Sequence, residues 1–77
     1  MSYPKEIRTS YNKVKKAIRL YCKGDEDVED EVLYELDMAM NHRNLRTEEE
    51  SDAMLTKYVK LFKVTEEDLW NWNDITE

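Results

Sequence analysis

The sequence predicts an all-α fold: a compact three-helix bundle, up-down-up, with a short fourth, C-terminal helix that caps one end. Its 77 residues include one glycine and one proline, too few for the repeated turns of a β protein. Hydrophobic residues make up 40% of the chain and charged residues 39%, a balance typical of small helices with solvated outer faces. We expect a single helical domain over residues 1–77, near the lower size limit for a self-sufficient core.

The first helix is expected over residues 4–22. Pro4 suits its first turn, because a missing backbone N–H costs nothing there. Gly24 then fits the left-handed conformation that ends a helix, and the short link that follows predicts an antiparallel hairpin with the next helix. The apolar side of this helix follows one heptad-like seam: Ile7, Tyr11, Val14, Ile18 and Tyr21.

The central helix is expected over residues 25–43. Asp25 is its predicted N-cap, and the acidic residues of the first turn lie where the helix dipole favours negative charge. Its apolar residues recur at steps of three and four, which predicts one buried face: Val28, Val32, Leu33, Leu36, Ala39 and Met40.

Two further helices are predicted from capping patterns. Thr47 and the three glutamates after it match a capping box, which predicts a helix over residues 47–63. A second such pattern at Thr65 predicts a short helix over residues 65–72, followed by a frayed tail over residues 73–77. The longer helix of the two has a broad apolar face: Met54, Leu55, Tyr58, Val59, Leu61 and Phe62.

The charges are strongly segregated along the chain. The formal net charge is −6, but residues 1–23 carry +6, residues 24–52 carry −10 and residues 53–77 carry −2. Such asymmetry calls for either pairing within the molecule or a partner. Across the predicted hairpin we expect three bases to lie near the acidic first turn of the central helix and to pair with it: Lys16, Arg19 and Lys23.

Catalytic and metal-binding functions are not expected. Cys22 and His42 are the only residues of their kinds, and no acidic group is placed by sequence to orient the histidine. The acidic run from Asp25 resembles a calcium loop at alternate positions, but Asp30 stands where the loop needs its glycine. Leu36 stands where it needs a bidentate glutamate. We therefore expect that the protein is not an enzyme and that it has neither a cofactor nor a metal site.

The compartment is predicted from what the sequence lacks. A single cysteine cannot form an internal disulfide, and the polar N-terminal residues do not resemble a signal peptide. No window approaches the ~20 apolar residues of a membrane span. We expect a soluble, intracellular protein of the cytoplasm that binds neither a membrane nor a small-molecule substrate.

These exclusions favour a small acidic, non-catalytic regulator that binds another protein. We hypothesise that it occupies a basic or nucleic-acid-binding surface of its partner, as inhibitors of the kind that phages and mobile elements encode would, and that it also forms a homodimer. Trp70 and Trp72 cannot both face the same way from one helix, and we place Trp70 in the core and Trp72 outside. The predicted partner-binding residues are acids that steer encounter and apolar anchors: Glu26, Asp27, Asp30, Glu31, Tyr34, Asp37, Met38 and Trp72.

The alternative is a nucleic-acid-associated protein that contacts phosphates through its basic first helix. The predicted contacts are Arg8, Lys15, Lys16 and Arg19. The stretch from Lys60 to Phe62, followed by Leu69 and Trp70, is similar to the C-terminal end of the Hha family, small helical partners of bacterial nucleoid proteins. This resemblance implies a nucleoid regulator, and it covers so short a segment that we carry over none of the family's residues.

Overall fold

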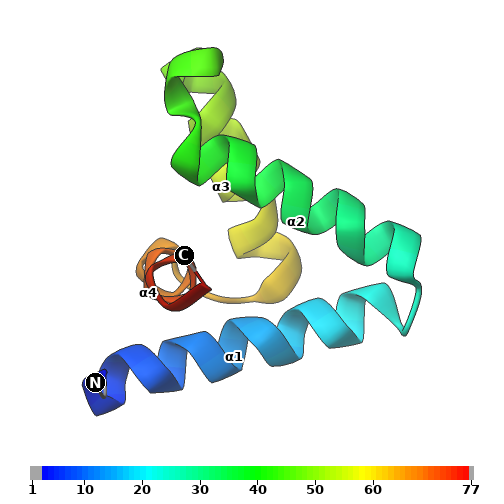
Figure 1. Ribbon diagram of the computed structural model, residues 1–77, viewed down its shortest axis with the longest axis vertical. Helices are drawn as coiled ribbons and strands as arrows, with labels where there is room; N and C mark the ends of the chain where they lie inside the picture. Colours follow the sequence, from blue (N-terminus) through cyan, green and yellow to red (C-terminus); the bar gives the residue numbers. More distant parts are fainter. Residues whose placement is uncertain (1–2, 77) are drawn as a thin grey trace.

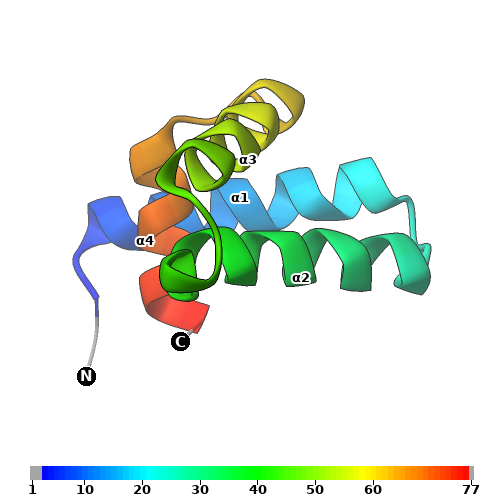
Figure 2. The same cartoon turned by 90° about the horizontal axis from the view of Figure 1, so that it is seen from above.

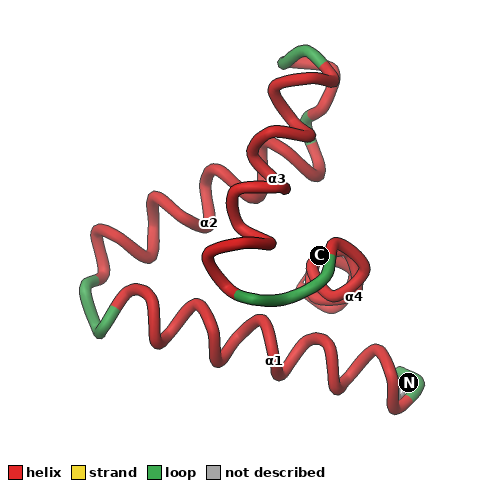
Figure 3. Tube along the Cα trace, turned by 180° about the vertical axis from the view of Figure 1, so that it is seen from behind, coloured by secondary structure: helices red, strands yellow, loops and turns green. Residues whose placement is uncertain are grey.

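The computed structural model describes residues 3–76, which form four α-helices joined by short loops (Figures 1 and 3). These residues contain no strand, so the predicted all-α bundle is confirmed. The elements are α1 (Lys5–Cys22), α2 (Glu26–Asn41), the single 3-10 turn η1 (Arg43–Leu45), α3 (Glu48–Phe62) and α4 (Glu66–Thr76).

The predicted N-caps of α2 and α3 are both present. The carboxylate of Asp25 accepts hydrogen bonds from the backbone N–H groups of Asp27 (3.0 Å) and Val28 (3.3 Å) at the start of α2. At the start of α3, the Thr47 hydroxyl accepts from the Glu50 N–H at 3.1 Å, while the Glu50 carboxylate accepts from the Thr47 N–H. Each pair of bonds satisfies N–H groups that have no partner inside the helix.

The helix ends use the left-handed conformation, and not only at glycine. Gly24 has φ = 82°, as its position predicts, but Lys23 before it is also left-handed at φ = 50° and forms the end of α1. Lys63 ends α3 in the same way at φ = 56°. A side chain in this conformation costs roughly 1–2 kcal/mol, which the rest of the fold must offset.

The hairpin of α1 and α2 opens away from its loop, and α4 lies in the opening. Figure 1 shows α4 end-on between the two longer helices, and Figure 2 shows it running across both of them. The third helix packs mainly along α2, while α4 packs mainly against α1. The fourth helix therefore lies in the open end of the hairpin, packed mainly on α1 and joined to α2 by the hydrogen bonds between Asn73 and Asn41. The sequence instead predicts that it caps one end of the bundle.

The buried apolar side chains form a single cluster to which all four helices contribute. Tyr21, the last residue of the predicted seam of α1, lies outside this cluster and is exposed. The members are Val14, Ile18, Cys22, Val32, Leu36, Ala39, Met40, Leu55, Tyr58, Phe62, Val64, Leu69 and Trp72.

The prediction for the two tryptophans is wrong. Trp72 is only 7% exposed and belongs to the core, whereas Trp70 is half-buried and donates its indole N–H to Glu66 on the same helix at 3.3 Å. The reason is the side of α4 that packs against the other helices. That side carries Leu69, Trp72 and Asn73, which are the buried residues of α4, and Trp70 lies outside it.

The predicted fraying from residue 73 is also wrong within the described chain, because α4 continues to Thr76; Glu77 lies outside the described residues. Asn73 is buried, and its side-chain amide exchanges two hydrogen bonds with that of Asn41 on α2, at 3.0 and 3.1 Å. The Thr76 hydroxyl donates to the Asn73 carbonyl at 3.1 Å. These contacts stabilise the last turn, which capping and propensity alone leave undecided.

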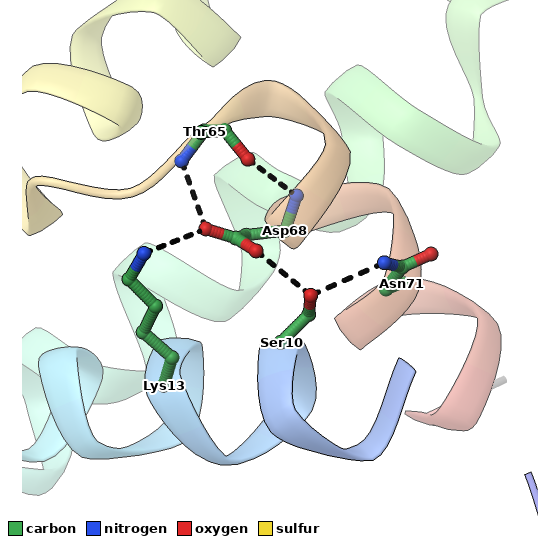
Figure 4. A network of polar contacts seen from close by, with 5 residues as sticks. All are labelled: Ser10, Lys13, Thr65, Asp68 and Asn71. Carbon is green, nitrogen blue, oxygen red and sulfur yellow. Dashed lines mark hydrogen bonds and ion pairs between the residues drawn. The ribbon is translucent and has the colours of Figure 1, made fainter. Parts of the chain in front are cut away.

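A polar network fixes the other end of α4 to α1 (Figure 4). The carboxylate of Asp68 caps α4 by accepting from the Thr65 N–H at 3.0 Å, and it also accepts from the Ser10 hydroxyl at 2.7 Å. Lys13 forms an ion pair with the same carboxylate at 3.1 Å, and Asn71 donates to the Ser10 hydroxyl at 3.2 Å. One carboxylate therefore both starts α4 and docks it on α1.

Candidate functional site

The outer side of α2 carries a continuous stripe of exposed acidic side chains, called here the acidic face. Its members follow one another at three- and four-residue steps and therefore share one side of the helix. Tyr34 stands in the middle and is 61% exposed, and Met38 beside it is half-buried. The acidic face comprises Asp27, Asp30, Glu31, Tyr34, Asp37 and Met38, with Glu26 in the first turn next to it.

Within the described residues, the acids near the start of α2 form no ion pair with a basic side chain. Among residues 3–76, no ion pair joins them to Lys16, Arg19 or Lys23, so the predicted pairing across the hairpin is wrong. The acidic face looks outward from α2, whereas the hairpin contact is on the opposite, apolar side. Its negative charge is therefore directed at solvent, where it attracts basic molecules.

A groove runs beside the acidic face, between α1, α2 and α4. It consists of two adjoining pockets that share Leu33, Trp72 and Thr76. We call it the α4 groove. One end is lined by Asp37, Asn41 and Asn73. The other end is lined by Tyr11, Lys15, Ile18, Arg19 and Glu29.

Asp37 connects the acidic face with the α4 groove. Its carboxylate accepts a hydrogen bond from the Asn41 amide at 2.9 Å and lies 3.4 Å from the imidazole Nε2 of His42. The groove floor beside it is apolar, because Leu33 and the edge of Trp72 line it. The sequence predicts that Trp72 is a protruding anchor, and this prediction is wrong. The small part of its side chain that remains accessible lines this groove.

The four residues of the predicted nucleic-acid contact are not brought to one site. Lys15 and Arg19 line the far end of the α4 groove together with Glu29, whose carboxylate opposes phosphate binding there. The Lys15 ammonium lies over the Tyr11 ring, 5.7 Å from its centroid. Arg8 and Lys16 are exposed on α1 but line neither pocket of this groove.

The single cysteine and the single histidine lie at opposite ends of α2, because Cys22 comes shortly before this helix and His42 directly follows it. Cys22 is buried, and this burial raises the pKa of its thiol, as do the nearby carboxylates of Glu29 and Asp25. A raised pKa keeps the thiol protonated and unreactive at neutral pH. Within residues 3–76, no group of three or more His, Cys, Asp or Glu side chains is placed to hold a metal ion. In the same part of the chain, no helix has the length and apolar character needed to cross a membrane.

Sequence reasoning missed the polar side of the α4 groove. Asn73 falls in the segment predicted to fray, and Asn41 has no pattern that marks it as a binding residue. One signal was available, because Leu69, Trp72 and Thr76 continue a helical spacing of three and four past the predicted end of α4. The contact between Asn73 and Asn41 has no such signal, because it depends on how α4 packs against α2.

Comparison with known proteins gives no match: no family model, no curated protein and no solved structure is significantly similar to this chain. The similarity of its C-terminal segment to the Hha family therefore has no support from a family match. The function is therefore inferred from the surface residues of the chain itself.

Proposed function

We propose that this protein is a non-catalytic binding module whose acidic face docks on a basic surface of a partner protein. One observation carries this proposal: Asp37 lies both on the exposed acidic face and at the edge of an apolar-floored groove. A lysine or arginine of the partner fits such a place, because its charged head can reach Asp37 while its aliphatic stem covers Leu33 and the edge of Trp72.

The two kinds of residue in the acidic face have different roles in this proposal. The carboxylates of Asp27, Asp30 and Glu31 increase the rate of encounter with a basic surface, an effect that salt screens. Tyr34 and Met38 provide apolar contact area, which slows dissociation once the complex has formed. A partner surface made for phosphates would meet both requirements, and the protein would act there by occupying it.

Affinity capture from bacterial lysate, with and without nuclease and with mass spectrometry as the readout, tests this function. We expect one dominant protein that survives nuclease and is lost when Asp30 and Glu31 are both changed to lysine. The matched control changes Glu48 and Glu49 to lysine, which alters the net charge equally at exposed positions of α3. Thermal unfolding verifies that both variants fold.

Three results would contradict the proposal. Capture that persists in the Asp30→Lys, Glu31→Lys variant would exclude the acidic face, and equal loss in the control would reduce the effect to net charge. Enrichment that disappears with nuclease would instead favour nucleic-acid binding at Lys15 and Arg19.

A further inference from the structure

Large apolar side chains are exposed around a second groove, which lies between the C-terminal parts of α1 and α3. Leu20 is 66% exposed, and Tyr21 and Leu61 are also exposed. The floor is formed by Ala17 and Phe62, and the Tyr21 ring meets the Phe62 ring edge-on with centroids 5.8 Å apart. Adjacent exposed apolar groups of this kind mark interaction sites more often than solvated surface.

The edge of this α1/α3 groove is basic. Lys63 lines it directly. On α1, Lys16 precedes Leu20 by four residues, so these two side chains share one side of the helix. Lys23 is the left-handed residue that directly follows the last turn of α1. Within the described chain none of these three lysines forms an ion pair. The groove therefore has an apolar centre and a positively charged edge that no acidic side chain of residues 3–76 neutralises by an ion pair.

The acidic face of α2 has the complementary composition. It has an exposed aromatic centre, Tyr34, and three carboxylates that form no ion pair with any described residue, Asp27, Asp30 and Glu31. The two surfaces belong to different helices, and the acidic face points outward, so one molecule cannot join its own two surfaces. A second copy brings them together.

We propose that the α1/α3 groove binds the acidic face of α2 from another copy of this chain. Such an interface is heterologous, because each molecule contributes its groove to one neighbour and its acidic face to another. It goes beyond the proposed function and does not depend on it. Where both hold, self-association covers the acidic face and competes with the partner protein.

Light-scattering mass measurement over a range of micromolar concentrations tests this interface. We expect the mass to rise above the 9.3 kDa of one chain with concentration, and to fall back towards it in high salt. Leu20→Glu and the double variant Asp30→Lys, Glu31→Lys should each remain a single chain when alone. Leu45→Glu is the matched control, because Leu45 is 65% exposed and lies outside the groove, and it should associate like the unchanged protein.

The decisive experiment mixes the two variants that are expected to be monomeric alone, Leu20→Glu and the double variant. Leu20→Glu retains its acidic face and the double variant retains its groove, so an equimolar mixture should give complexes of two chains that grow no further. A mixture that stays at the mass of one chain would overturn the proposal, as would an unchanged protein that never exceeds that mass in low salt. Association of the double variant alone would show that groove binds groove.

The outcome is separable from that of the proposed function. Leu20→Glu leaves the acidic face intact, so it should capture the partner protein at least as well as the unchanged chain. Partner capture without self-association would overturn only this inference, and self-association without capture would overturn only the proposed function.

Discussion

Replacement of Asp68 by asparagine should remove a large part of the stability of this protein at neutral pH. The carboxylate is 14% exposed and accepts from the Thr65 N–H, the Ser10 hydroxyl and the Lys13 ammonium (Figure 4). Burial by itself would raise the pKa of Asp68, but these donors outweigh it and lower the pKa from its ordinary 3.8 to about 2. Asparagine keeps the shape but loses the charge and one acceptor.

The size of the effect follows from the two pKa values. The difference between 3.8 and about 2 corresponds to about 2 kcal/mol in the free energy of unfolding at pH 7. A chain of this length has a total stability of roughly 4–12 kcal/mol, so the loss is a substantial fraction of it. Because the folded state has the lower pKa, this stabilisation is complete well above pH 3.8 and is lost as the pH falls towards 2. At pH 2 most of this stabilisation is lost.

Thermal unfolding and urea unfolding, both followed by circular dichroism at pH 7 and pH 2, measure this difference. At pH 7 we expect Asp68→Asn to lower the melting temperature by roughly 10–20 °C, and at pH 2 the variant and the unchanged protein should be nearly equal. Asp74→Asn, at an exposed carboxylate on the same helix, is the control and should have little effect. An equal loss at both pH values, or a loss below about 0.5 kcal/mol at pH 7, would refute the assigned role of the Asp68 charge.

Four further substitutions test the packing. Ser51→Ala should stabilise the protein by about 1 kcal/mol in chemical denaturation, because the Ser51 hydroxyl is fully buried in α3 with no hydrogen-bond partner among the described residues; a destabilised variant would reveal a partner. Lys63→Gly should add about 0.5–1 kcal/mol by relieving the left-handed strain at φ = 56°, and a loss of stability would contradict that conformation. Trp72→Ala should cost about 3–5 kcal/mol and Trp70→Ala less than half of that. In the single-tryptophan variants, Trp72 should fluoresce at the shorter wavelength, and the reverse order would restore the assignment predicted from sequence.

The helix starts are the part of this fold that sequence predicts best. Asp25, Thr47 and Thr65 each satisfy N–H groups two or three residues further along, so the interaction is contained in the sequence pattern. The outward direction of the carboxylates on α2 is equally local, because the apolar spacing of Val32, Leu36 and Ala39 fixes which side of the helix is buried.

The ion pairs and the tryptophans illustrate what sequence reasoning could not provide. The charge pattern places opposite charges on neighbouring helices, yet an ion pair also needs side chains that face each other, and among residues 3–76 none joins Lys16, Arg19 or Lys23 to the acids of α2. The spacing of Trp70 and Trp72 shows only that they point differently. Which of them is buried depends on the element that α4 meets.

Local sequence patterns were enough to predict four helices, their starts, the order in which they follow one another, and an acidic, exposed side of α2. These features depend on residues within about one helical turn of each other, where backbone geometry leaves few alternatives. The packing of the helices, which no local pattern contains, places α4 between α1 and α2, buries Trp72 and puts Asp37 at the edge of a groove. Those outcomes come from contacts such as Ser10 with Asp68 and Asn41 with Asn73, whose partners are far apart along the chain and meet only when the helices pack.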